Sequence, residues 1–259
     1  MIKKTKLQIV THLLKENRAI WLLLYAGERL FKTAAFFHRQ RVRWEIFRKL
    51  PGFNTTQYNY KEWSHYDWSR QGEEWTDSTP WRQALIDEVL KPHLQPNATV
   101  LEIGPGAGRW SETLAALSKK LILVDLTERS IAHCRERLKA HPHVAYHQNN
   151  GRDLSFLSHN SVDFVWSFDV FVHLSPGDTE QYLEATKKIL SPAGIAVIHH
   201  PAIGGIRGGF RSSVTNELFC QLLKKHNLTL IRQFDSFGKD DGFSVRTYGD
   251  MITVFGRTA

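Results

Sequence analysis

The sequence predicts an α/β fold: a doubly wound, mostly parallel sheet of seven strands with helices on both faces, preceded by an N-terminal helical extension. The main observation is a regular alternation from Ala84 onward, in which short apolar runs suited to strands alternate with segments of helical periodicity. A glycine-rich turn directly after the first strand supports the same prediction, because doubly wound sheets bind ligands beyond the carboxyl ends of their strands.

The alternation places the elements in order. The expected strands are 99–103, 121–124, 144–147, 162–167, 195–198, 228–234 and 251–256. The expected helices are 82–90, 109–117, 130–141, 179–190 and 215–226. Helices between successive strands favour parallel pairing, so the strand ends form one common edge.

Composition and charge exclude several classes of protein. The 259 residues are 42% hydrophobic and 23% charged, which excludes a fibrous or disordered chain. Two cysteines, Cys134 and Cys220, cannot form a disulfide framework or a cysteine zinc site, and they fit a reducing cytoplasm. Residues 1–50 hold 12 basic and 3 acidic side chains, whereas the other 209 residues hold 22 and 23. A near-neutral domain with a basic extension is therefore expected, not a uniformly basic nucleic-acid binder.

Three regions are expected: a basic amphipathic helical extension (1–52), an aromatic lid or linker (53–81) and the α/β domain (82–259). The longest apolar run of the extension, 19–27, is too short for a membrane span of about 20 residues, and a signal peptide is not expected either. Basic amphipathic helices pack on their own domain, pack on a second copy in a homodimer, or lie peripherally on an anionic membrane. These alternatives stay open, with a cytoplasmic location expected.

The aromatic region precedes the first helix of the domain, where a lid can close over a ligand. It has no aliphatic run, and its aromatic residues are Trp63, Trp68, Trp75, Trp81, Tyr58, Tyr60 and Tyr66. We expect an irregular segment lying over another part of the protein. Trp68 and Trp75 are predicted to bind substrate by stacking on a sugar or ring, with simple packing on the sheet as the alternative.

The glycine-rich turn reads Gly104-Pro105-Gly106-Ala107-Gly108. Glycines at every second position let the backbone approach a ligand closely, because no Cβ atoms intervene. The spacing differs from the G-x-G-x-x-G of dinucleotide sites. Glu102, two residues before the turn, would repel a phosphate and attract an ammonium or sulfonium group.

Two further strand ends carry polar groups at the same edge. Asp125 ends the second strand, where a carboxylate can accept both hydroxyls of a ribose. Asn150 and Gly151 follow the third strand. Three such elements at consecutive strand ends are more specific than the glycine turn alone.

From about Pro80 to the C-terminus, these residues resemble the class I S-adenosyl-L-methionine (SAM)-dependent methyltransferases. The resemblance implies SAM as cofactor, with Glu102, Gly104, Gly106 and Gly108 around its methionine portion, Asp125 on the ribose, Asn150 and Gly151 at the adenine and Ser167 near the methyl group. Position 150 is often Asp in this family, but an amide oxygen can also accept from the adenine amino group. A narrower similarity, which includes segment 208–212, is to bacterial methyltransferases of glycan and small-metabolite pathways.

Candidate catalytic residues follow strands four and five. His173 has a suitable pKa for a general base, about 6.5, and Asp169 four residues earlier would orient it. His200 is a second candidate base, while His199 and Phe171 are predicted to bind substrate. Adjacent strand residues point to opposite sides, so at most one of the two histidines should face the cleft. Packing of His173 in a loop is the alternative to catalysis.

No metal is expected. His173, His199 or His200 could join Asp169 as ligands, but no two-histidine motif of fixed spacing supports such a site. Asp240 and Asp241 lie in a glycine-containing late loop and are expected to be solvated.

The predicted function is methyl transfer from SAM to an oxygen, less readily a nitrogen, of a small-molecule or carbohydrate-like acceptor. An RNA methyltransferase using the basic extension is a rival, but the segment after strand four lacks the Asn/Asp-Pro-Pro-aromatic tetrad of base-amino methyltransferases. A non-catalytic SAM-binding protein is a third alternative, against which the complete set of cofactor elements argues.

Overall fold

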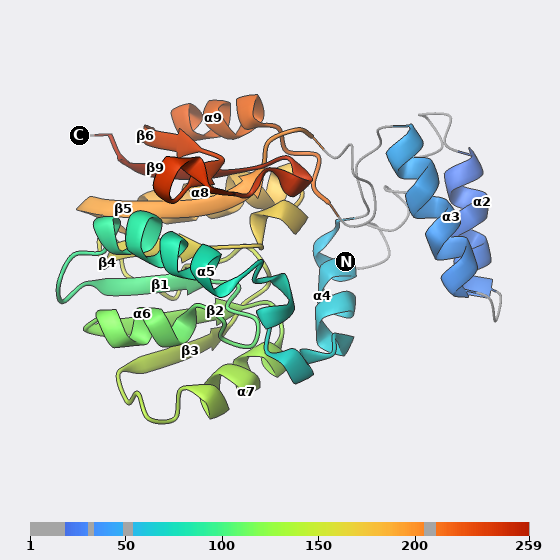
Figure 1. Ribbon diagram of the computed structural model, residues 1–259. Coiled ribbons are helices and arrows are strands. Elements are labelled where there is room, and N and C mark those ends of the chain that lie inside the picture. The colour runs from blue at the N-terminus through green and yellow to red at the C-terminus, as the bar shows by residue number, and fades with distance from the viewer. Residues whose placement is uncertain (1–18, 31–33, 49–53, 205–210, 259) are drawn as a thin grey trace.

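The computed structural model describes residues 19–30, 34–48, 54–204 and 211–258. The first part of the basic extension, the predicted turn at Pro51 and Gly52, and segment 208–210 lie outside the described residues. Within the described part, the predicted architecture is confirmed: a seven-stranded, mostly parallel sheet with helices on both faces and N-terminal helices before it (Figure 1).

The sheet has the strand order β3-β2-β1-β4-β5-β9-β6. Its strands are β1 (Thr99–Ile103), β2 (Lys120–Asp125), β3 (Val144–Gln148), β4 (Val162–Ser167), β5 (Leu190–Pro201), β6 (Leu228–Phe234) and β9 (Asp250–Arg257). The first five run parallel, whereas β9 runs antiparallel to β5 and β6. Since the strand order reverses between β1 and β4, a ligand crevice is expected at their carboxyl ends. A separate ribbon pairs β7 (Ser236–Phe237) with β8 (Phe243–Ser244).

Two groups of helices cover the sheet. One face packs against α5 (Thr79–Leu85), α6 (Ser111–Leu117) and α7 (Glu128–Arg137), and the other against α8 (Pro176–Ile189) and α9 (Asn216–Lys225). Successive strand residues enter opposite cores, so Val100 lies in the first and Leu101 in the second. Burial on both faces explains the nearly continuous apolar runs of the strands.

Hydroxyl caps set where several helices begin. Ser78, Thr127 and Ser175 each accept a hydrogen bond from the backbone N–H three residues later, at the starts of α5, α7 and α8. These helices begin two or three residues before the positions that apolar periodicity predicts, because the first turn is polar.

The aromatic region contains a helix, α4 (Thr56–His65), and two short 3₁₀ turns, Trp68–Arg70 and Glu73–Trp75. The prediction of an entirely irregular segment is therefore wrong. Tertiary contacts hold α4: Asn59 Nδ2 donates to the His173 carbonyl at 2.8 Å, and Thr56 Oγ1 donates to Asp178 at 3.0 Å. Figure 1 shows α4 standing at one end of the sheet.

The N-terminal helices α2 (Ala19–Leu30) and α3 (Ala34–Phe47) pack against each other as a hairpin. A Cβ at Gly27 would lie 2.5 Å from the Phe37 ring, so glycine permits this close approach. No described helix is long and apolar enough to cross a bilayer.

Candidate functional site

A cavity lies at the carboxyl ends of β1, β2 and β4, beneath the aromatic region. Its lining surrounds about 880 Å³ of space, a volume that includes the open mouth. Its described lining comes from the glycine turn, from strand ends and from the aromatic region, and includes Gly104, Gly106, Arg109, Asp125, Gly151, Asp169, His173, Trp63, Trp68 and Trp75.

The glycine turn forms one wall of the cavity and requires its glycines. Gly104 and Gly106 have φ angles of +69° and +59°, in the left-handed region that favours glycine. A Cβ at Gly106 would lie 2.8 Å from the indole of Trp68. The aromatic region therefore covers bare backbone at this point.

Asp125 lies at the end of β2 and lines the cavity. Its Oδ1 accepts from the Thr127 backbone N–H at 2.8 Å, and its Oδ2 accepts from the Gly106 N–H at 3.3 Å. Burial raises the pKa of Asp125 to about 6, although these hydrogen bonds oppose the shift. The carboxylate is thus fixed in orientation, with lone pairs left for a ligand's hydroxyls.

Glu102 lies beneath the glycine turn rather than in the cavity lining. Ser111 Oγ donates to its carboxylate at 2.5 Å, and burial raises its pKa to about 7. Gly108 also faces away from the cavity, since a Cβ there would approach Arg137 and Cys134 of α7. The prediction that Glu102 and Gly108 contact a ligand directly is therefore wrong. Glu102 acts on the cavity through its charge, and Gly108 lets the turn pack closely against α7.

A chain of charged side chains runs from the cavity along the strand ends. Asp169 follows β4 with a φ of +62°, and its Oδ2 accepts from Arg109 Nη2. Its Oδ1 lies 3.1 Å from Nδ1 of His199 on β5. Both oxygens of Asp169 are thus engaged by groups other than His173, so the predicted pairing of Asp169 with His173 is wrong.

The chain continues to the first residue of β9. His199 Nε2 lies 3.4 Å from Oδ2 of Asp250, whose Oδ1 pairs with Arg211. Because β9 is antiparallel, its first residue lies at the edge where β5 ends, and Asp250 is in register with Pro201. Cations and carboxylates alternate throughout, so each charge has an opposite neighbour.

These neighbours set the protonation states. Burial opposes ionisation of Asp169, but Arg109 and His199 outweigh it and hold its pKa below the usual range. Burial similarly opposes the charge of His199, but Asp169 and Asp250 raise its pKa. The pKa of Asp250 is lowered, because His199 and Arg211 outweigh its burial. Asp169 is therefore ionised and a poor proton acceptor near neutral pH.

His173 lies in a 3₁₀ turn after β4 and lines the cavity. Its ring centroid is 5.4 Å from that of Trp63, at the border between the strand ends and the aromatic region. The general-base role of His173 therefore stays a prediction, and its place in the cavity lining is compatible with it.

Several predicted site residues lie elsewhere. On β5, Val197 and His199 face one side of the sheet, while Ile198 and His200 face the other. His200 stacks on Phe219 at 3.7 Å and bonds Thr253 Oγ1 at 2.7 Å, and burial lowers its pKa to about 3. It is a neutral core residue, so the catalytic role predicted for it is wrong.

Phe171, predicted to bind substrate, is 1% exposed and packs in the core against Tyr182. Ser167 Oγ donates to the Ile103 carbonyl inside the sheet. Asn150 Oδ1 accepts backbone N–H groups of its own loop, outside the cavity, whereas Gly151 lines it. His199 contacts Asp169 and lies behind the cavity rather than in its lining.

Sequence reasoning missed Arg109 and Asp250. Arg109 is 4% exposed and stacks on Trp110, and its buried Nη1 has no hydrogen-bond partner among the described residues. No local pattern marks it. Asp250 could have been found as an acid that begins an antiparallel strand, which places it at the edge where the parallel strands end.

No group of three or more His, Cys, Asp or Glu side chains in the described residues is arranged to hold a metal ion. The cavity does suit SAM by its chemistry. Positive-φ glycines give close backbone approach, Asp125 offers oriented acceptors, and buried Glu102 favours positive charge. Buried Nη1 of Arg109 and Nε1 of Trp68, both without partners, add donors at its wall.

Residues 100–194 match the methyltransferase domain family, and this match spans β1 to β5, including the glycine turn and Asp125. Residues 100–194 of the chain are therefore a methyltransferase domain. The predictions of this family, of its fold and of SAM as its cofactor are confirmed.

Curated relatives of the chain agree with this family match. A probable SAM-dependent methyltransferase of Mycobacterium tuberculosis is 32% identical over 117 residues, which are 44% of this chain and 40% of that protein. A probable SAM-dependent methyltransferase of Mycolicibacterium smegmatis is 29% identical over 56% of this chain and 54% of its own length. The chain thus spans only about half of the relatives that it matches.

Solved methyltransferase structures share the fold. A TehB-like SAM-dependent methyltransferase from Corynebacterium glutamicum has a TM-score of 0.55 at 17% identity, covering 78% of this chain and 98% of that one. The N-methyltransferase NodS from Bradyrhizobium japonicum has a TM-score of 0.56 at 17% identity, covering 71% and 99%.

We expect the SAM affinity of the protein to rise with pH between about 5 and 7. Glu102 and Asp125 have pKa values of about 7 and 6. A cationic ligand favours their charged forms, so binding should release protons in this range. Titration calorimetry in buffers of different ionisation enthalpy measures that release. Glu102→Gln should flatten the rise, whereas Glu112→Gln, exposed on α6, should not; equal pH profiles for both variants would rule out the role of Glu102.

Proposed function

We propose that the chain transfers the methyl group of SAM to an oxygen, less readily a nitrogen, of a small-molecule or carbohydrate-like acceptor. The observation that carries the proposal is one cavity that joins the glycine turn and Asp125 to aromatic side chains and His173. Bound SAM supplies a methyl group activated by a positively charged sulfur. The protein must then hold the cofactor, orient the acceptor and accept a proton.

The aromatic region supports an acceptor with flat, partly apolar faces. The ring centroids of Trp63 and Trp75 are 6.0 Å apart and those of Trp68 and Trp75 are 5.8 Å apart, both in edge-to-face arrangement. Such walls suit sugars and rings, which present C–H or π faces.

The polar groups of the cavity have complementary tasks. Ionised Asp169 can accept a hydrogen bond from the O–H or N–H of an acceptor, but its lowered pKa makes it a weak base. His173 also lines the cavity, and imidazole is the side chain that most often accepts protons in general base catalysis. Asp169 would therefore orient the nucleophile while His173 removes its proton.

A nitrogen acceptor is the second candidate. Nodulation protein S of Sinorhizobium fredii is 30% identical over 93 residues, covering 35% of this chain and 43% of that protein, and the related structure NodS is an N-methyltransferase. This likeness favours nitrogen, whereas His173 favours oxygen, because a hydroxyl has a proton that must be removed and a free amine is already nucleophilic.

Formation of S-adenosylhomocysteine from SAM should be measured with matched acceptors that differ only in a hydroxyl or an amino group at one position. We expect turnover with the hydroxyl member of a pair. Turnover with the amino member alone would select the nitrogen acceptor. SAM binding in calorimetry without turnover on any sugar, ring or amine of a broad panel would contradict the proposed activity.

A further inference from the structure

The hairpin of α2 and α3 buries an ion pair and exposes several large apolar side chains. Arg41 and Glu45 have no exposed surface and form an ion pair of 2.5 Å, and Trp21 Nε1 donates to Glu45 at 2.6 Å. Five large apolar side chains are exposed instead: Ile20 (47%), Leu23 (71%), Phe36 (51%), Ile46 (46%) and Phe47 (74%). Helices in water normally show the opposite pattern.

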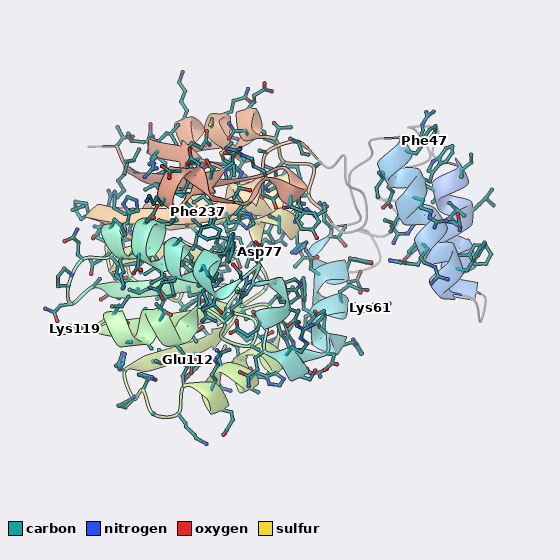
Figure 2. All side chains as sticks on the ribbon, viewed as in Figure 1. Phe47, Lys61, Asp77, Glu112, Lys119 and Phe237 are labelled. Carbon is teal, nitrogen blue, oxygen red and sulfur yellow. The ribbon has the colours of Figure 1, made fainter. Side chains whose placement is uncertain are left out.

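The exposed apolar residues share helix faces with cations. Phe36 and Phe47 are eleven residues apart, about three turns, and so lie on the same side of α3. Arg39 and Arg43, both exposed, lie between them on this side. Figure 2 labels Phe47 at the C-terminal end of α3. On α2, Ile20 and Leu23 share a face at a spacing of three.

The charge of this surface is uniform. Among the described side chains of residues 19–48, the exposed charged groups are Arg39, Arg43 and Arg48, all cations. The acid of α3, Glu45, is buried against Arg41. A surface that combines apolar side chains with cations complements anionic lipid headgroups above acyl chains. Pairing of the same face in two copies would bring arginines together, which costs free energy.

Over their described residues, the two helices are too short to span a bilayer. They contain 12 and 14 residues, about 18 and 21 Å at 1.5 Å per residue, against a hydrocarbon core of about 30 Å. A helix pair of this size can lie within one interface of a membrane.

We propose that the α2–α3 hairpin docks the protein on an anionic lipid surface. Leu23, Phe47 and their apolar neighbours enter the boundary between headgroups and acyl chains, and Arg39 and Arg43 bind lipid phosphates. This proposal does not depend on the methyl acceptor.

The test is sedimentation of the full-length chain with vesicles of phosphatidylcholine, alone or mixed with phosphatidylglycerol. We expect binding to the mixed vesicles that weakens as salt is added. The double variant Leu23→Asp, Phe47→Asp should bind at least about tenfold more weakly. The double variant Arg39→Gln, Arg43→Gln should bind about tenfold or more weakly and lose most of the salt dependence. The matched control is Leu230→Asp on β6, 43% exposed, which should bind as wild type does.

Equal binding by wild type and the Leu23→Asp, Phe47→Asp variant would overturn the proposal, and so would equal binding to both vesicle types. A dimer in light scattering that this variant converts to a monomer, without vesicle binding by either, would identify the face as a contact between copies and also overturn it. SAM affinity, measured by calorimetry on the same samples, reports whether the α/β body is intact and separates this result from the proposed methyl transfer.

Discussion

Replacing Asp125 with Ala is expected to weaken SAM binding by roughly 150-fold. The fixed carboxylate of Asp125 would accept two ribose hydroxyls, and each hydrogen bond to a charged group contributes about 1.5 kcal/mol or more. Loss of both amounts to about 3 kcal/mol, and about 1.4 kcal/mol changes the dissociation constant tenfold. Titration calorimetry with SAM and with S-adenosylhomocysteine measures the effect. Both ligands should lose affinity alike, because they share the ribose.

Two further variants distinguish the loss of ribose binding from a general disturbance of the loops around the cavity. Asp125→Asn retains one acceptor oxygen and should fall between wild type and Asp125→Ala. Asp153→Ala removes an exposed acid that bonds only its own loop in the described structure, at Ser155, and should leave the dissociation constant within about twofold. Unchanged affinity in a folded Asp125→Ala protein would refute the ribose role.

His199→Gln is expected to lower the free energy of unfolding by about 3–5 kcal/mol. His199 lies between Asp169 and Asp250, at 3.1 and 3.4 Å, and is only 3% exposed. Glutamine is neutral and leaves two carboxylates without their shared cation. Breaking a buried ion pair from one side has a cost of this order, because the remaining charge stays buried. Urea unfolding of wild type and variant measures the difference.

The difference should depend on pH in a defined direction. The pKa of His199 is raised on folding, so its contribution is complete below about pH 6.5 and is lost as pH rises through the folded value. The pKa values of Asp169 and Asp250 are lowered, so their contributions are complete above about pH 4 and are lost as pH falls through the folded values. We therefore expect the largest difference between about pH 4 and pH 6.5.

His226→Gln is the matched control. His226 pairs with Glu180 at 3.2 Å near the surface, where Glu180 is 32% exposed, so its loss should cost less than about 1 kcal/mol. If both histidine variants unfold alike at every pH, the charged chain along the strand ends does not stabilise the fold.

The strand predictions succeeded where local sequence carries the signal. Observed β1, β4 and β6 coincide with the expected 99–103, 162–167 and 228–234. For β1 and β4 the reason is burial on both faces of the sheet, which requires nearly continuous apolar residues. The expected 195–198 was shorter than β5, which begins at Leu190. Its first part, with Ser191, Pro192 and Gly194, lacks the apolar pattern of a buried strand.

The part of the site that follows β1, β2 and β3 could also be predicted from the sequence. Gly104, Gly106, Asp125 and Gly151 follow consecutive parallel strands, so chain order alone brings them to one edge, and all four line the cavity. Asn150 illustrates the limit. The sequence predicted that Asn150 and Gly151 both face the ligand. The Asn150 side chain instead accepts hydrogen bonds from the backbone of its own loop, and only Gly151 of the two lines the cavity.

What the sequence alone determined is the α/β fold, the glycine turn and the acid of the second strand, because these depend on periodicity and on residues adjacent in the chain. Only the tertiary structure decided which side chains meet across the strand ends. Arg109, Asp169, His199, Asp250 and Arg211 come from separate segments up to 141 positions apart and converge because β9 inserts antiparallel beside β5. The pleat, which sends neighbouring side chains to opposite faces, predicts that His199 and His200 are separated. The tertiary structure decided that His199 is the one beside Asp169.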